Sequence, residues 1–308
     1  IVGTEEIDLI LTYLKKLNIT FSNLITPPSQ YHHLFHASSS FYTSEFKEAL
    51  CLVIDGYGGI HTIPNSKTIG LETTSIFYFK SPNIHKSLYY NLQVNTTLGT
   101  ELNMDNQDDA SADRDINYNL DIGMMYSSIC HYLGWNFLEG GKLMGLSAYG
   151  NFNPKIPPLL AENSLYGNMN LFLPNQSINP KFYPILNKAK NNPSNNISKD
   201  LAFSAQYILE KIILARINQS LKYNSTKNIV ISGGCALNVV NNYKLKKTFP
   251  NINFYIDPLG NDGGQSMGAA LYYYHKLTNL QKQEPLKHLY HGPRYSKEDL
   301  LNSIKKYV

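Results

Sequence analysis

The sequence has few cysteines, and none is spaced as a metal or redox motif requires. Only three occur among 308 residues, Cys51, Cys130 and Cys235, and each lies in apolar or glycine-rich surroundings. An odd number without a Cys-x-x-Cys pair argues against a disulfide framework. We therefore expect reduced thiols and a cytoplasmic protein, with Cys235 a small buried thiol rather than a nucleophile.

Long apolar runs and strong net charge are also absent. No run approaches the roughly 20 apolar residues that span a bilayer, so we expect no membrane contact. The formal net charge is +4, and the lysines are scattered apart from a short cluster at 244–247. Without a basic stripe, nucleic acid is not expected as the main ligand. A hydrophobic fraction of 43% excludes a wholly disordered chain.

Helical and β-prone patterns alternate along the chain. The apolar spacing predicts helices over 5–17, 31–41, 122–133, 140–149, 200–221, 236–245 and 263–274, and strands over 49–54, 228–231 and 254–256. The remaining segments indicate a hairpin over 61–78 with a turn at 65–66, an acidic loop over 103–115 and an irregular stretch over 151–196. Strand, glycine turn and helix follow one another twice, which indicates an α/β fold.

A pair of histidines is the first candidate site. His32 and His36 lie one turn apart on an expected helix, so both imidazoles can reach one metal ion. Imidazole is a common ligand of divalent transition metals, although two histidines need further ligands from elsewhere. The alternative is a pair at a helix start with ordinary hydrogen bonds. His33, between them, points elsewhere and could contact substrate or cap the helix.

Two aspartates follow predicted strands. Asp55 ends the strand over 49–54 and precedes a glycine-rich turn at 56–59, and Asp262 precedes Gly263 and a helix with small residues. In open α/β sheets the ligand crevice lies beyond the carboxyl ends of the strands, where a carboxylate suits a metal or a polar ligand. An ordinary Asx turn at Asp55 and a helix N-cap at Asp262 are the alternatives.

Two glycine-containing segments are candidates for nucleotide contact. Gly233 and Gly234 join a strand to a helix start, where free N–H groups favour an anion, and Asn238 follows them. Lys142 and Gly145 belong to a Gly-Lys-Leu-Met-Gly-Leu segment that lacks the residue order of a P-loop. Tight packing of the glycines and an ordinary surface lysine are the alternatives.

Taken in order along the chain, these motifs resemble the NodU/CmcH carbamoyltransferases. The matching segments cover 32–37, 55–56, 141–150, 233–238, 262–271 and 290–296. The last of them, Tyr-His-Gly-Pro-Arg-Tyr-Ser, looks like the family's hinge between two domains. The resemblance extends over nearly the whole chain.

The resemblance implies an enzyme, an ATP-dependent O-carbamoyltransferase. Such enzymes move a carbamoyl group from carbamoyl phosphate, through carbamoyl-adenylate, to the hydroxyl of a small-molecule acceptor. It implies an actin/Hsp70/sugar-kinase-like (ASKHA) fold, a duplicated ribonuclease-H-like architecture, for residues 1–292, with the family's first strand lying upstream of Ile1. Residues 293–308 would be the hinge and the start of a truncated YrdC-like C-terminal domain, which makes the adenylate in the full-length protein.

Residue by residue, the resemblance also implies a site. A divalent metal, iron first with manganese or zinc as alternatives, would be held by His32, His36, Asp55 and Asp262. ATP or carbamoyl-adenylate would be held by Gly233, Gly234, Asn238 and Gly263, with Lys142 and Gly145 in a matching segment. The catalytic candidates are Asp55 and His33, the latter as a general base.

Two other functions stay open at this stage. One is a related ASKHA enzyme, such as a tRNA threonylcarbamoyl transferase or a kinase, and the other is a non-catalytic nucleotide-binding module. The lack of a basic surface argues against tRNA, and the complete set of four metal-ligand candidates argues against a degenerate module. The acceptor, whether sugar, antibiotic or modified nucleoside, is left open, as is a homodimer.

Overall fold

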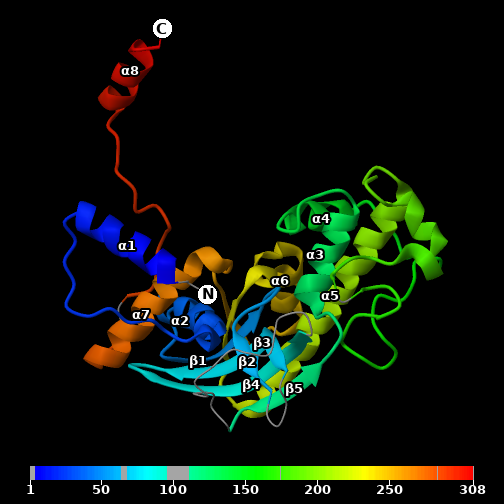
Figure 1. Cartoon of the computed structure of the whole chain (residues 1–308), viewed down its shortest axis with the longest axis horizontal. Coiled ribbons are helices and arrows are strands. Elements are labelled where there is room, and N and C mark those ends of the chain that lie inside the picture. The colour runs from blue at the N-terminus through cyan, green and yellow to red at the C-terminus, as the bar shows by residue number, and fades with distance from the viewer. Residues whose placement is uncertain (1–3, 64–67, 96–110, 174, 283, 308) are drawn as a thin grey trace.

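The computed structural model describes residues 4–63, 68–95, 111–173, 175–282 and 284–307. One mixed sheet runs through the described chain, with helices on both of its faces (Figure 1). The strands lie in the order β5-β4-β3-β1-β6-β7, and β2 pairs with β3. Their bounds are β1 Glu48–Ile54, β2 Ile60–Thr62, β3 Ile69–Lys80, β4 Ile84–Asn95, β5 Asp113–Asn117, β6 Asn228–Ser232 and β7 Asn253–Ile256. The expected α/β class is confirmed.

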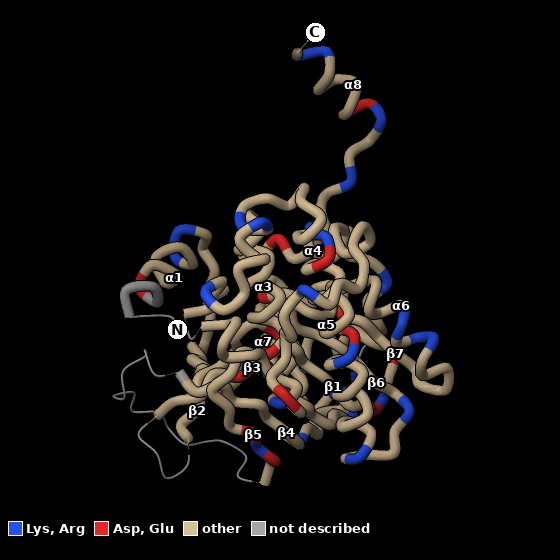
Figure 2. The backbone as a smooth tube through the Cα atoms, turned by 90° about the vertical axis from the view of Figure 1, so that its right-hand side faces the viewer, with Lys and Arg blue, Asp and Glu red and all other residues tan. Residues whose placement is uncertain are grey.

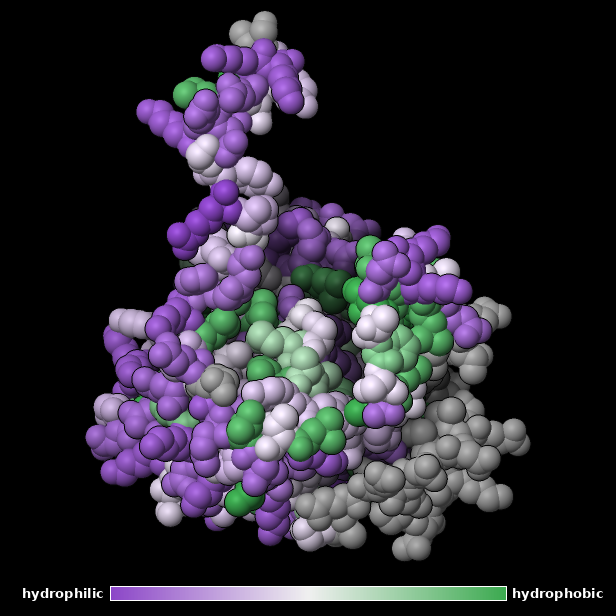
Figure 3. Space-filling view, turned by 90° about the vertical axis from the view of Figure 1, so that its left-hand side faces the viewer, coloured by the Kyte–Doolittle hydropathy of each residue, from purple (hydrophilic) through white to green (hydrophobic). Residues whose placement is uncertain are grey.

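The helices fall into two layers and two outlying segments. The layers are α2 His32–Thr43 with α7 Gln265–Thr278 on one face, and α3 Ile122–Tyr132, α4 Gly140–Ser147, α5 Asn196–Tyr223 and α6 Val239–Thr248 on the other. The outlying helices are α1 Thr4–Lys16 and α8 Lys297–Lys305. Figure 3 shows the segment with α8 as a mostly hydrophilic projection from the body. None of the helices in the described ranges is long and apolar enough to cross a membrane.

Charge is mixed over the side of the molecule seen in Figure 2. Lys and Arg are interspersed with Asp and Glu along the tube rather than gathered in one stripe.

β1 is the central strand and carries the core on both of its faces. Leu50, Leu52 and Ile54 pack into the cluster under α3 and α5, whereas Cys51 and Val53 pack into the cluster under α2 and α7. Because successive side chains alternate across a strand, a strand covered on both faces needs a continuous apolar run, as the sequence predicted. β1 is parallel to β6, and β6 is parallel to β7, so their carboxyl ends lie at one edge of the sheet.

α7 packs closely on α2, and a glycine permits the approach. α2 is buried from His33 to Thr43, and its hydroxyls bond back to carbonyls one turn earlier, such as Ser38 to Leu34 at 2.7 Å. A Cβ on Gly268 of α7 would lie 2.0 Å from the Phe35 carbonyl oxygen of α2. The small residues after Asp262 thus bring α7 against α2.

The sequence-based element assignment was wrong in three places. It did not predict β4, which mixes polar and apolar residues without a regular pattern, although β4 pairs with β3 along nearly its whole length. It assigned 113–115 to a loop, whereas these residues begin β5, a charged edge strand beside β4. The helix predicted from 236 is instead a 3-10 turn over Gly234–Leu237 followed by α6. The predicted turn at 65–66 and residues 103–110 lie outside the described residues.

We predict that Gly268→Ala lowers the free energy of unfolding by about 1–3 kcal/mol, because the new methyl group must push α7 away from α2. The matched control is Gly145→Ala on α4, where no atom beyond the chain neighbours and the backbone of the same helix lies within 4 Å of an added Cβ. That change is expected to be neutral or to stabilise by about 0.5–1 kcal/mol. Urea unfolding of the two variants measures both effects, and equal stabilities would contradict the packing argument.

Candidate active site

Four side chains from three segments meet at the carboxyl edge of the sheet. His32 Nε2 lies 3.6 Å from Asp55 Oδ2 and 3.4 Å from Asp262 Oδ1. The corresponding distances from His36 Nε2 are 3.5 and 3.3 Å. An ion bound at about 2.0–2.2 Å separates neighbouring ligands by about 3.0–3.6 Å. The donor set of two imidazoles and two carboxylates, with one ligand atom from each within 4.8 Å of all the others, therefore fits a divalent ion.

The fold fixes each of these donors. Asp55 directly follows β1, and its Oδ1 accepts the backbone N–H of Gly234 at 3.0 Å, which leaves Oδ2 facing the histidines. Asp262 begins the 3-10 turn that leads into α7. His32 opens α2 and His36 follows one turn later. The packing of α2 on β1 and α7 thus assembles the cluster.

The four groups shift one another's pKa values. Burial acts to raise the pKa of Asp55, but hydrogen bonds from His32 and His36 hold it well below its usual range. Hydrogen bonds from the same histidines lower the pKa of Asp262. Burial acts to lower the pKa of His32, yet its contacts with Asp262 and Asp55 outweigh burial and raise the pKa to about 9. Both carboxylates are ionised at neutral pH, and an ion that binds here must displace the imidazole protons.

A further carboxylate, which the sequence did not single out, lies buried behind the cluster. Glu72 on β3 is fully buried, and its Oε2 accepts the backbone N–H groups of Gly59 at 2.9 Å and His33 at 3.2 Å. Its Oε1 lies 2.8 Å from His61 Nε2. Burial acts to raise its pKa, but His33 and His61, which are protonated at the acidic pH where Glu72 titrates, lower it to about 2. Glu72 thereby ties the first turn of α2 to the turn after β1.

His33 belongs to this buried layer and not to the pocket. Its Nδ1 lies 2.7 Å from Ser75 Oγ, and the imidazole is fully buried. A Cβ on Gly58 would stand 2.5 Å from the His33 ring, so the turn after β1 covers it. Burial lowers the pKa of His33 to about 4, which keeps the ring neutral at pH 7. The geometry gives His33 a role in holding α2 in place.

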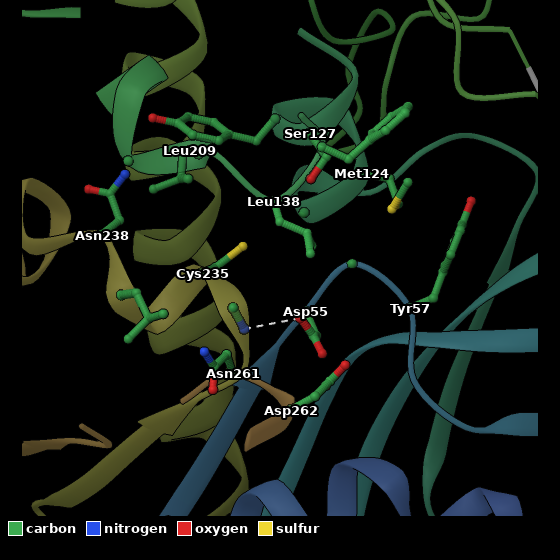
Figure 4. Close-up of a pocket in the computed structure, with 18 of the residues that line it drawn as sticks. Asp55, Tyr57, Met124, Ser127, Leu138, Leu209, Cys235, Asn238, Asn261 and Asp262 are labelled. Atoms are coloured by element: carbon green, nitrogen blue, oxygen red, sulfur yellow. Dashed lines mark hydrogen bonds between the residues drawn. The ribbon is translucent and has the colours of Figure 1, made fainter. Parts of the chain in front are cut away.

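A pocket of about 720 Å³ opens above the carboxylates (Figure 4). Asp55 and Asp262 point toward one another at one end of it, and Met124 and Leu138 stand on the opposite side. Tyr57 forms a lateral wall, where its hydroxyl accepts a hydrogen bond from Gln93 at 3.0 Å. The pocket is therefore acidic at its floor and largely apolar above, a form typical of small-molecule sites.

Three of the predicted nucleotide contacts line this pocket. They are Gly234, Asn238 and Gly263. The Asn238 amide is held by Gln206, to which it donates at 2.8 Å and from which it accepts at 3.1 Å. Gly233 lies beneath the floor with a φ of 86°, and a Cβ there would stand 2.3 Å from the Ile54 carbonyl oxygen. Only glycine fits that position.

The other two predicted contacts are on the outside of α4. Lys142 is exposed and pairs with Glu139, and Gly145 faces open space. Residues of the same helix that do line the pocket are Gly140, Gly141 and Met144.

The start of α3 also lines the pocket, although the sequence analysis did not select it. Gly123 and Met124 lie there, and a Cβ on Gly123 would stand 2.2 Å from the Asp55 carbonyl oxygen. The available signal was Asp121, whose side chain caps α3 at Ile122, directly before that glycine. The importance of Gly123 depends on its close approach to Asp55, which is distant in sequence.

Comparison with known proteins gives a consistent family. The family model described as "Carbamoyltransferase N-terminus" matches residues 7–271. The chain is 27% identical over 293 residues to an uncharacterized protein of Synechocystis, which covers 89% of this chain and 41% of that protein. It is 25% identical over 263 residues to the nodulation protein NolNO of Sinorhizobium fredii, which covers 85% and 33%.

A shorter match is to the tRNA N6-adenosine threonylcarbamoyltransferase of Fervidobacterium nodosum. It is 29% identical over 143 residues, covering 45% of this chain and 41% of that protein. The chain spans less than half the length of these curated relatives.

We predict that Glu72→Gln destabilises the protein in a pH-dependent way. A carboxyl whose pKa falls from 4.5 to about 2 on folding contributes stability that is present above pH 4.5 and is lost as the pH falls toward 2. The variant should be less stable than the wild type at pH 7, and the difference should shrink between pH 4.5 and 2. Urea unfolding across this range measures it, with the partly exposed Glu48→Gln as control. A cost that is the same at every pH would contradict the assignment.

Proposed function

The chain belongs to the carbamoyltransferase N-terminus family, and we propose that it is the transfer domain of an O-carbamoyltransferase. The proposed reaction is ATP-dependent and passes a carbamoyl group from carbamoyl phosphate, through carbamoyl-adenylate, to a hydroxyl of a small-molecule acceptor. The observation that carries this proposal is the cluster of four donor groups at the floor of a pocket of about 720 Å³. A volume of that size suits a ligand as large as a nucleotide.

The metal is a proposal that rests on the chemistry of the donors. His32, His36, Asp55 and Asp262 would hold a divalent ion, with iron proposed first and manganese or zinc as alternatives. Such an ion polarises a carbonyl oxygen and lowers the pKa of a bound hydroxyl. The two carboxylates are ionised at neutral pH, so in this proposal they carry charge and do not donate protons.

The protein's own groups would orient the nucleotide. Gly234 and Gly263 let a phosphate approach the backbone at the pocket floor, where it would compete with Asp55 for the Gly234 N–H and with Asn261 for the Gly263 N–H. Asn238, fixed by Gln206, would fix the position of the nucleoside. Lys142 and Gly145 remain proposed nucleotide contacts, although neither residue lines the pocket. For His33 we now favour a positioning role over that of a general base, because its ring is covered by Gly58.

The finer fold and the domain division are also proposals. We propose that the mixed sheet is part of the duplicated ribonuclease-H-like architecture of ASKHA proteins. We further propose that residues 1–292 form the transfer domain and 293–308 the hinge and start of a YrdC-like domain that supplies carbamoyl-adenylate. The projection of α8 from the body (Figure 1) and the greater length of the relatives support this division.

A second candidate function is threonylcarbamoyl transfer to tRNA. It is favoured by the match to a tRNA N6-adenosine threonylcarbamoyltransferase over 45% of the chain. The nature of the acceptor distinguishes the two candidates.

The central test measures metal content and carbamoyl transfer together. The full-length protein is given ATP, carbamoyl phosphate and a panel of hydroxyl acceptors, and product is followed by mass spectrometry. We expect His36→Ala to lose bound metal at least about tenfold and to lose product. The exposed His291→Ala serves as control and should retain both. A metal-free wild type that still forms product would contradict the proposal, and transfer to tRNA alone would favour the second candidate.

Two glycines of α4 test where the nucleotide lies. Gly141 lines the pocket and has no atom within 4 Å of an added Cβ, so Gly141→Trp can extend into the mouth of the pocket. We expect it to weaken adenine nucleotide binding at least about tenfold, since the side chain occupies the ligand's volume. Gly145→Trp, one turn along on the outside, should leave affinity unchanged by calorimetry. The reverse order of effects would favour the assignment of Gly145 made from the sequence.

A further inference from the structure

Gln265 places its side-chain amide among the four donor groups. Its Nε2 lies 2.7 Å from His32 Nε2, 3.3 Å from His36 Nε2 and 3.0 Å from Asp262 Oδ1. The matching segment 262–271 contains this residue, but the sequence assigned it no role, because it acts from the first position of α7 and meets α2 only in the folded chain.

The backbone around Gln265 is fixed by close packing on both sides. A Cβ on Gly264 would stand 2.2 Å from the Leu259 carbonyl oxygen, and one on Gly268 would stand 2.0 Å from that of Phe35. The first turn of α7 is therefore held against both α2 and the loop before it. Because Gln265 is three residues after Asp262, both side chains project from this turn toward the same point.

The position of the amide determines whether its oxygen or its NH₂ group can bind a cation. Imidazole nitrogens and carboxylate oxygens that share an ion all direct lone pairs at it, so a fifth group among them must do the same. The amide oxygen offers lone pairs and the NH₂ group does not. A half-turn about the last side-chain torsion exchanges the two ends, and this torsion is broad.

We propose that Gln265 is a fifth ligand of the ion, through its Oε1, and that it sets the metal preference of the site. The inference rests on the proposed metal dependence. Two carboxylates already balance a divalent charge, so a neutral oxygen adds coordination without adding charge. A fifth ligand disfavours the four-coordinate tetrahedron typical of structural Zn²⁺. Amide oxygen is a hard ligand of the kind that suits Mn²⁺, so the site should prefer five- or six-coordinate ions.

The test compares two ions and two substitutions by calorimetric titration of the full-length protein. Gln265→Leu keeps the side-chain size but removes the oxygen, and it should weaken Mn²⁺ binding about tenfold or more while changing Zn²⁺ binding less than about threefold. Gln265→Glu keeps an oxygen in place and should retain Mn²⁺ binding. Ser266→Ala, an exposed neighbour on α7, should change neither affinity.

A spectroscopic measurement reports coordination number without any turnover. With Co²⁺ as the probe, the wild type should show the weak visible bands of five or six ligands, and Gln265→Leu the more intense bands of four. Equal losses of Mn²⁺ and Zn²⁺ affinity, or no loss at all, would overturn the role of Gln265 while leaving the metal site intact. A wild type that binds neither ion would instead overturn the metal site on which the inference rests.

Discussion

Asp55 and Asp262 carry like charge and are separated by more than 200 residues, yet both must lie beside the same two imidazoles. Bringing the partly buried Asp55 and the exposed Asp262 together is unfavourable unless positive charge lies between them. His32 and His36 meet that need because α2 runs beside the carboxyl ends of the parallel strands. The approach of α7 to α2, permitted by Gly268, then sets how close Asp262 can come. The packing of the two helices therefore also determines the electrostatics of the cluster.

The buried layer behind the cluster makes this geometry rigid. Glu72 accepts two backbone N–H groups and contacts His61, and His33 contacts Ser75. Partners of this kind, one shell removed from the ligands, orient metal sites in many proteins. Since the same groups support the first turn of α2, a substitution among them should change both stability and ligand geometry.

The sequence was informative where a local pattern has one physical explanation. The apolar run of β1 predicts a strand buried on both faces, so Asp55 had to lie at a sheet edge, and the four-residue spacing of the histidines predicts one helix face. Glu72 and Gln265 could not be found in this way. Glu72 begins a run of four polar residues within β3, and only the cover by α2 and the turn after β1 reveals its burial. β4 was missed because its buried polar residues form hydrogen bonds with residues elsewhere in the chain, which a local pattern does not show.

Asp55 divides its two oxygens between different tasks, since Oδ1 holds the Gly234 N–H and Oδ2 faces the histidines. A ligand that draws the carboxylate toward the histidines also moves the amide at the pocket floor. A ligand seated on that amide turns the carboxylate in return. Thermodynamic linkage makes such effects reciprocal: if one ligand changes the affinity of the second by some factor, the second changes the affinity of the first by the same factor. In the proposed site, one aspartate is therefore enough to couple the metal half to the nucleotide half.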